Sequence, residues 1–207
     1  MIQLFGLRMS NYYSLTKALM EYKGVAYEEV KAPPTQKEDN LERTPMGKMP
    51  SIGLDGVYMS ESLAIATYLD RIAPEPALLP SDPFQAGKAM EIACHVKLDV
   101  ELVARRCLPE AFFGQTVSDE TKAEAQKDLA KGMAALQRIL VCDPYAAGSE
   151  LTIADFYMFY TFGLAGGISQ AIWGEDLLAG HDNIQALMAK LAELPAIAKV
   201  EADKAEG

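Results

Sequence analysis

Apolar positions in the first third of the chain follow two different spacings. Residues 2–6 are largely apolar, and residues 26–31 alternate between apolar and polar side chains, so both stretches indicate short strands. Residues 14–23, which lie between them, have helical spacing. This order predicts a βαβ unit at the start of the chain.

A β-hairpin and a helix are predicted to follow. The Pro-rich, charged residues 32–45 can hold at most a short irregular helix. Residues 50–54 and 57–59 are apolar runs on either side of Asp55-Gly56, a pair that favours the tight turn of a hairpin. An amphipathic helix is then predicted from Glu61 to Ile72, with apolar positions at Leu63, Ile65, Ala66, Leu69 and Ile72.

The second part of the chain has helical spacing throughout. It begins with residues 73–84, which contain four prolines in twelve positions, the composition of an ordered connector. Helices are predicted at residues 84–112, 118–140 and 152–163, with two shorter ones after Asn183 and Pro195. We therefore expect an α/β domain at residues 1–76, a linker at 77–83 and an all-α domain at 84–207.

The composition is that of a globular chain. Of its 207 residues 50% are hydrophobic and 23% are charged, which is enough apolar surface to form a real core. No run reaches the roughly 20 apolar residues that span a bilayer, and the N-terminus lacks the charged start and long apolar stretch of a signal peptide. We expect a cytoplasmic protein with no membrane partner.

The charge excludes one class of partner. A formal net charge of -10 and a pI near 4.7 repel phosphate backbones, so we expect no nucleic acid partner. Cys94, Cys107 and Cys142 fit neither a paired disulfide framework nor a C-x-x-C motif, and we expect reduced, mostly buried thiols. His95 and His181 do not lie at ligand spacing from another His or Cys, so we expect no metal site.

Lys48-Met49-Pro50-Ser51 places a proline directly before a predicted strand. A cis Met49-Pro50 bond would turn the Met49 backbone sideways, where its N–H and C=O can pair with a peptide-like ligand. Taken alone, the segment favours an ordinary trans bond, since only about 5–6% of such bonds in folded proteins are cis.

Ser60-Glu61-Ser62 lies where the second hairpin strand ends and a helix begins. Free N–H groups at the helix start can receive a ligand carboxylate beside Ser62, while Glu61 can hold an ammonium. Together these groups suit an amino-acid head. Taken alone, the segment favours a plain helix cap with Glu in the first turn.

Residues 47–72, GKMPSIGLDGVYMSESLAIATYLDRI, resemble the glutathione-binding half of the cytosolic glutathione transferases. The resemblance extends to residues 22–28, the Pro-rich connector and the helical second half, so it covers nearly the whole chain. It implies an α/β thioredoxin-like N-terminal domain followed by an all-α C-terminal domain. It also implies a cis Met49-Pro50 bond and glutathione contacts from Lys48, Met49, Pro50, Glu61 and Ser62.

In this family, the loop before the first helix carries the residue that hydrogen-bonds the glutathione sulfur. Counting back from Gly24 at the end of that helix, Ser10 lies where the Ser-type transferases, including bacterial ones, place their catalytic serine. Asn11 and Tyr12 are alternatives, because bacterial members differ in which loop residue faces the sulfur. Tyr12 and Tyr13 fit equally well as an interface residue and a pocket-rim residue. The loop contains no cysteine, which argues against mixed-disulfide chemistry.

The resemblance implies a transferase that activates the thiolate of glutathione for attack on a small electrophile, a detoxification reaction. Isomerase, dehalogenase and peroxidase variants share the site, and the family implies a homodimer. The helical domain would line the co-substrate pocket, where Arg105 and Arg106 can meet an acidic co-substrate, although at least one should be a surface charge. The alternative is a non-catalytic binding or regulatory protein of the same fold, which the intact set of site residues disfavours.

Thr152 and Asp155 stand three apart before an apolar run, the pattern of a capping box. We therefore expect Asp155 to have a structural role, not a catalytic one.

Overall fold

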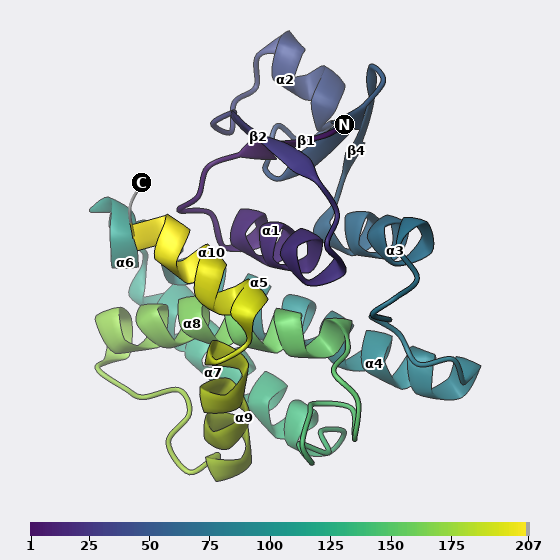
Figure 1. The fold of residues 1–207 in the computed structure, drawn as a ribbon. Coiled ribbons are helices and arrows are strands. Elements are labelled where there is room, and N and C mark those ends of the chain that lie inside the picture. Colours follow the sequence, from purple (N-terminus) through teal and green to yellow (C-terminus); the bar gives the residue numbers. More distant parts are fainter. Residues whose placement is uncertain (206–207) are drawn as a thin grey trace. The chain divides into compact units, whose positions relative to one another are not determined.

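Four short strands form one mixed sheet in the first part of the chain (Figure 1), in a computed structural model that describes residues 1–205. The sheet order is β2-β1-β3-β4. β1 pairs in parallel with β2, and the pairs β1–β3 and β3–β4 are antiparallel. The strands are β1 (Ile2–Gly6), β2 (Tyr27–Lys31), β3 (Ser51–Leu54) and β4 (Val57–Ser60).

These strands confirm the predicted βαβ unit and hairpin. At the hairpin turn Asp55 has φ 52° and Gly56 has φ 81°, so both central residues take the positive φ that a tight two-residue turn requires. The thioredoxin-like topology that the resemblance implies is therefore present in this part of the chain.

Helices flank this sheet. They are α1 (Asn11–Lys23), α2 (Glu38–Arg43) and α3 (Ser62–Ile72). A fourth helix of this part, α10 (Pro195–Ala205), comes from the end of the chain and packs on α1. α1 starts three residues before the expected position and ends at Gly24, whose φ of 63° is left-handed. Its apolar side buries Leu15 and Leu19 completely, together with Leu4 of β1 and Leu69 of α3.

The chain divides into two compact units, and α10 belongs to the first. The first unit comprises Met1–Leu78 and the residues from Glu193 onward, and the second is Leu79–Ala192. α10 packs on α1 (Figure 1), where Ile197 and Val200 are buried. The first unit therefore includes C-terminal residues that the sequence analysis placed in the all-α domain at 84–207. The sequence could not indicate this, because an apolar helix face does not reveal which element it packs on.

The second unit is helical. Its first segment, expected as one helix, is a run of five pieces that includes a π-helix. The helices are α4 (Pro83–His95), η1 (Val96–Glu101, a π-helix), α5 (Leu102–Ala104), η2 (Arg105–Cys107, a 3-10 helix), α6 (Leu108–Phe113), α7 (Asp119–Gln137), α8 (Ile153–Trp173) and α9 (Asp182–Ala192).

The predicted end of α8 at Gly163 is wrong, because the helix continues for ten further residues to Trp173. A glycine stops a helix when it takes the left-handed conformation, and here Gly174 does so, with φ 68°. α8 is the central apolar element of this unit, since Phe156, Tyr157 and Met158 are completely buried.

Within residues 1–205, no helix combines the length and the apolar character needed to cross a membrane.

Candidate functional site

The register of the sheet brings three predicted site segments to one edge. Ser51 of β3 pairs with Phe5 of β1 on one side and with Ser60 of β4 on the other. The residues after β1, before β3 and after β4 therefore leave the sheet at the same edge. α1 begins at Asn11 and α3 at Ser62, so the N–H groups of both first turns also lie near this edge.

The Met49-Pro50 peptide bond is cis, which confirms the prediction. Pro50 is buried, Met49 is partly buried and Lys48 is exposed. The loop before them is fixed by Gly47, whose C=O accepts a hydrogen bond from the Thr35 N–H at 3.1 Å. Gly47 has φ 64°, and a Cβ there would lie 2.5 Å from the Thr35 carbonyl oxygen, so this close approach requires glycine.

Glu61 and Ser62 join β4 to α3. Glu61 is the N-cap residue of α3 and has φ 71°, a left-handed conformation that is costly for a residue with a Cβ. Its side chain is exposed, while Ser62 is buried. Strained backbone of this kind clusters at ligand sites, so the conformation of Glu61 marks the start of α3 as a functional candidate.

Ser10 is the N-cap residue of α1, but its hydroxyl does not cap the helix. Its backbone is extended, with φ -78° and ψ 126°. The backbone makes the local bonds, because the Ser10 N–H donates to the Leu7 carbonyl and the Ser10 carbonyl accepts from the Ser14 N–H, both at 2.9 Å. The hydroxyl therefore lies at the positive end of the α1 dipole without being used as a cap.

The three residues that follow Ser10 lie in different surroundings. Asn11 has a buried side-chain Nδ2 with no hydrogen-bond partner among residues 1–205. Tyr12 is partly buried. Tyr13 is almost completely buried, and its hydroxyl donates to Glu29 Oε2 at 2.7 Å. Burial and this hydrogen bond raise the pKa of Tyr13, which makes it a packed residue and not a donor at the sheet edge.

Glu29 of β2 is the centre of a charged cluster that the sequence analysis missed. Burial alone would raise its pKa, but hydrogen bonds from Arg8, Lys17 and Tyr13 lower the pKa to about 2. The available sequence signals are a carboxylate on a strand and a lysine inside an apolar helix. Neither one specifies the other as its partner.

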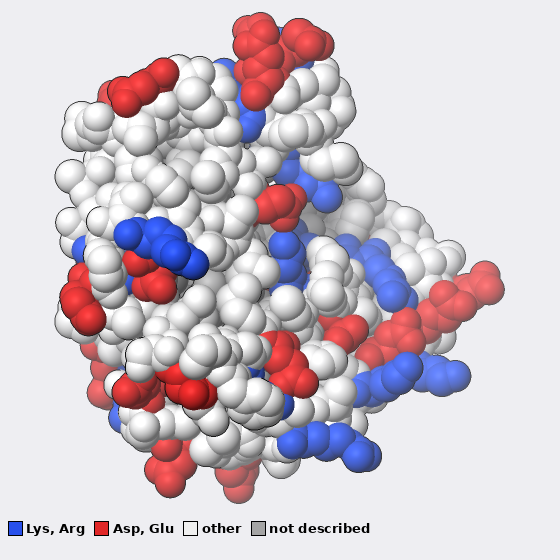
Figure 2. Space-filling model, turned by 90° about the vertical axis from the view of Figure 1, so that its right-hand side faces the viewer, with Lys and Arg blue, Asp and Glu red and all other residues white. Residues whose placement is uncertain are grey.

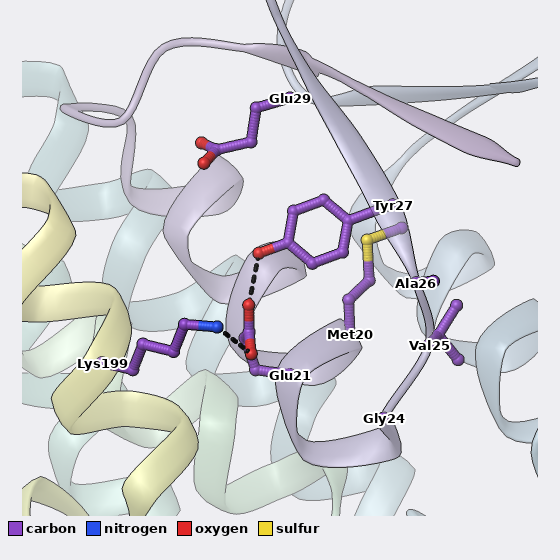
Figure 3. A pocket seen from close by; sticks show the side chains of 8 residues that line it. All are labelled: Met20, Glu21, Gly24, Val25, Ala26, Tyr27, Glu29 and Lys199. Atoms are coloured by element: carbon purple, nitrogen blue, oxygen red, sulfur yellow. Dashed lines mark hydrogen bonds and ion pairs between the residues drawn. The ribbon is translucent and has the colours of Figure 1, made fainter.

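A hollow of about 490 Å³ opens beside α1, β2 and α10 (Figure 3). Glu21 connects the polar side chains that line the hollow, since it accepts hydrogen bonds from the Tyr27 hydroxyl and from Lys199 Nζ, both at 2.6 Å. The hollow contains none of the predicted glutathione contacts, so we do not assign it to that site. Its lining residues are Met20, Glu21, Gly24, Val25, Ala26, Tyr27, Glu29 and Lys199.

The two arginines of the second unit differ in their surroundings. Arg105 Nε and Nη2 donate to Oε1 of the completely buried Glu101 at 2.8 and 2.7 Å. Arg106 pairs with Asp128 at 2.7 Å, at the surface, where the two side chains are 42% and 46% exposed. The expectation that at least one of them is a surface charge is confirmed by Arg106.

Asp155 closes the capping box at the start of α8. It is completely buried and accepts from the N–H groups of Ala146 and Thr152 at 2.7 and 2.8 Å, and from the Thr152 hydroxyl at 3.2 Å. Burial raises its pKa against the opposing effect of these hydrogen bonds. Its contacts connect a loop to a helix start, which is the structural role expected of it.

Charged side chains of both signs share the face drawn in Figure 2. On the face in Figure 2, Asp and Glu side chains are interspersed with Lys and Arg. The three cysteines are free thiols, of which Cys107 is buried. In the described part of the chain, no group of three or more His, Cys, Asp or Glu side chains is arranged to hold a metal ion.

Both halves of the sequence match known domain families. Residues 4–77 match the N-terminal domain of glutathione S-transferases, and residues 108–204 match the C-terminal domain. The second match includes α10, which is therefore part of the C-terminal domain by sequence although it packs with the first unit.

The curated relatives include a glutathione S-transferase, an isomerase and a stringent starvation protein homolog. A glutathione S-transferase of Pseudomonas putida is 36% identical over 99% of this chain and 93% of its own. A probable maleylacetoacetate isomerase of Drosophila melanogaster is 33% identical over 57% of this chain and 47% of its own. A stringent starvation protein A homolog of Pasteurella multocida is 28% identical over 92% and 85%.

The fold also has solved counterparts. A glutathione transferase from Populus trichocarpa superposes over 100% of both chains with a TM-score of 0.83. At 16% identity this likeness describes the fold alone.

Proposed function

This chain belongs to the glutathione S-transferase family, and on that premise we propose that it binds glutathione at the sheet edge and activates the thiol for attack on a small electrophile. One observation carries the proposal. The pairing of Ser51 with both Phe5 and Ser60 gathers the Ser10 loop, the cis-proline loop and the Glu61-Ser62 helix start at one edge. Together these groups suit a peptide that carries an amino-acid head and a thiol.

The binding roles follow from the chemistry of the ligand. Glutathione is a peptide, so its backbone can pair with the Met49 backbone as an added strand does. Its glutamyl head carries an ammonium for Glu61 and a carboxylate for the Ser62 N–H and hydroxyl at the α3 N-terminus. Lys48, exposed in the same loop, can meet the second carboxylate of the ligand.

For the sulfur we propose the Ser10 hydroxyl as the donor. It makes no capping bond and lies at the positive end of α1, where a thiolate is stabilised over a thiol. The reaction then forms a carbon–sulfur bond as the thiolate attacks, and a leaving group departs or the product carbanion is protonated. The buried, unpartnered Nδ2 of Asn11 makes that residue the strongest alternative donor, followed by Tyr12.

A second function has an observation in its favour. The relation to a stringent starvation protein A homolog, over 92% of this chain, supports a non-catalytic regulatory protein of the same fold. The maleylacetoacetate isomerase relative supports isomerisation at the same thiolate.

Retention on immobilised glutathione, followed by a screen of electrophiles and of maleyl-type isomerisation substrates, separates these functions. A transferase is retained and consumes glutathione stoichiometrically. An isomerase is retained, and it requires glutathione without consuming it. Lack of retention and of all turnover would overturn the proposal in favour of the regulatory function.

We also propose that the protein is a cytoplasmic homodimer. In each subunit, residues 1–76 would form the glutathione-binding domain, residues 77–83 the linker, and residues 84–207 the helical domain that supplies the co-substrate pocket. Light scattering at micromolar concentration and cell fractionation test the assembly and the location. A monomer, or a membrane or exported fraction, would contradict them.

A further inference from the structure

A charged cluster lies behind the loop that carries Ser10. We call it the Glu29 cluster. It joins β2, α1, α10 and the loop between β1 and α1. Its members are Arg8, Tyr13, Lys17, Glu29 and Asp203.

Both oxygens of Glu29 are occupied twice. Oε2 accepts from Arg8 Nε at 3.1 Å and from the Tyr13 hydroxyl at 2.7 Å. Oε1 accepts from Arg8 Nη2 and from Lys17 Nζ, each at 2.8 Å. One carboxylate on β2 therefore holds the loop and α1 in a single arrangement.

The cluster is balanced in charge. Lys17 has only 2% of its side chain exposed, and its Nζ also lies 2.6 Å from Asp203 of α10. Arg8 Nη1 donates to the Asp203 carbonyl at 3.3 Å. Two cations thus meet two anions. Lys17 is buried, whereas Arg8, Glu29 and Asp203 have 41%, 26% and 27% of their side chains exposed. Removing a partner of Lys17 would leave a buried charge uncompensated, which is costly.

The loop is held along its length. The ring of Tyr13 packs on Gly6, where an added Cβ would clash with Cδ2 of the ring. The ring therefore covers the start of the loop. The Arg8 carbonyl accepts from the Ser14 hydroxyl at 3.0 Å, and the Arg8 side chain is bound by Glu29. Ser10 follows two residues later and closes the turn onto Leu7.

We propose that Glu29 is a positioning residue for thiol activation, acting through Arg8 and Tyr13 on the segment that contains Ser10 and Asn11. This inference rests on the proposed function. It holds whichever of the two donates to the sulfur, because both follow the same anchored turn. Small displacements of catalytic groups are costly, since an error of about 1 Å can reduce turnover by roughly a hundredfold.

The chain offers a matched control. Lys199 of α10 pairs with Glu21 near the opposite end of α1, at 2.6 Å (Figure 3). This pair also joins α10 to α1, but it does not contact the Ser10 loop. Lys199 also lies within electrostatic range of Glu29 and Asp203. Lys199→Met therefore removes an ion pair between the same two helices without removing any hydrogen bond to the Ser10 loop.

The first arm of the test uses the protein without ligand. Amide hydrogen exchange over residues 7–12 should be at least about fivefold faster in Glu29→Gln and in Tyr13→Phe than in the parent, and unchanged in Lys199→Met. Tyr13→Phe keeps the ring on Gly6, so it decides the matter if Glu29→Gln does not fold. Equal exchange in the parent and in a folded Glu29→Gln or Tyr13→Phe would overturn the positioning role.

The second arm uses glutathione and an electrophile that the parent conjugates. In Glu29→Gln the turnover should fall by about tenfold or more and the pKa of the bound thiol should rise, while the Michaelis constant for glutathione changes by less than about twofold. A purely structural role predicts an unchanged thiol pKa and turnover per folded molecule, and that result would overturn the inference. If the parent itself neither binds nor conjugates glutathione, the proposed function fails, whereas the first arm still decides whether Glu29 orders the loop.

Discussion

Tyr13 donates its hydroxyl to Glu29 across 2.7 Å, and the same ring covers the backbone of Gly6. This relationship assigns the two neighbouring tyrosines of the loop different roles. Tyr13 is committed to the interior of the first unit, so Ser10, Asn11 and Tyr12 are left as candidates for the sulfur.

Alkaline titration tests the state of Tyr13. Burial, followed by its hydrogen bond to Glu29, raises the pKa of Tyr13 above its ordinary value of 10.0. A raised folded-state pKa favours the neutral form, so its contribution to stability is complete below pH 10 and is lost as the pH rises above that value. The free energy of unfolding should therefore fall above about pH 10 less steeply in Tyr13→Phe than in the parent. Urea unfolding at several alkaline pH values measures this, and identical slopes would contradict it.

Acid unfolding tests Glu29 with the opposite sign. The pKa of Glu29 is lowered from 4.5 to about 2 in the folded protein. Its contribution to stability is therefore complete above about pH 4.5 and is lost as the pH falls toward 2. Glu29→Gln should be less stable than the parent at pH 7, and the difference should shrink between about pH 4.5 and 2. A constant difference across that window would show that ionised Glu29 is not what stabilises the cluster.

Local signals in the sequence identified the βαβ unit, the hairpin and the following helix of the first unit, and the capping box of the second. The Asp55-Gly56 turn and the pairing of Thr152 with Asp155 both depend on residues close together in the chain. The cis Met49-Pro50 bond followed from the family resemblance, because the local sequence alone favours a trans bond. The Glu29 cluster was missed because its members come from positions 8 to 203, and only the packing of α10 on α1 brings Asp203 to Lys17. The end of α8 was misplaced because Gly163 stops a helix only when its φ becomes positive, which the residue type alone does not determine.

Asp155 should matter for folding and not for turnover. Asp155→Ala leaves the buried N–H groups of Ala146 and Thr152 without an acceptor and removes the capping box. We expect the free energy of unfolding to fall by about 2–4 kcal/mol. Activity per folded molecule should be unchanged at a temperature where the variant is folded. A fully stable variant that has lost activity would assign Asp155 a catalytic role instead.

Glu61 should affect binding more than chemistry. Glu61→Gln keeps the size of the side chain and removes the charge that faces the glutamyl ammonium in the proposed complex. The loss should be about 1.5–3 kcal/mol of glutathione binding, with a raised Michaelis constant and a nearly constant turnover. Isothermal titration with glutathione measures the change. The same titration of Lys48→Gln serves as a comparison, because Lys48 is proposed to meet the other carboxylate of the ligand. A variant that binds normally and turns over slowly would place Glu61 in the chemical step.

The pKa of the bound glutathione thiol in Ser10→Ala tests the central claim most directly, and ultraviolet absorbance of the thiolate across a pH series measures it. The lost hydroxyl matters only to the anion, so binding should be nearly unchanged while the thiol pKa rises by about 1–2 units. Turnover should fall near neutral pH and recover in part in alkali. Asn11→Ala and Tyr12→Phe should keep the parent's thiol pKa. If Ser10→Ala keeps that pKa and Asn11→Ala or Tyr12→Phe raises it, the sulfur is activated by that residue and the assignment of Ser10 is wrong.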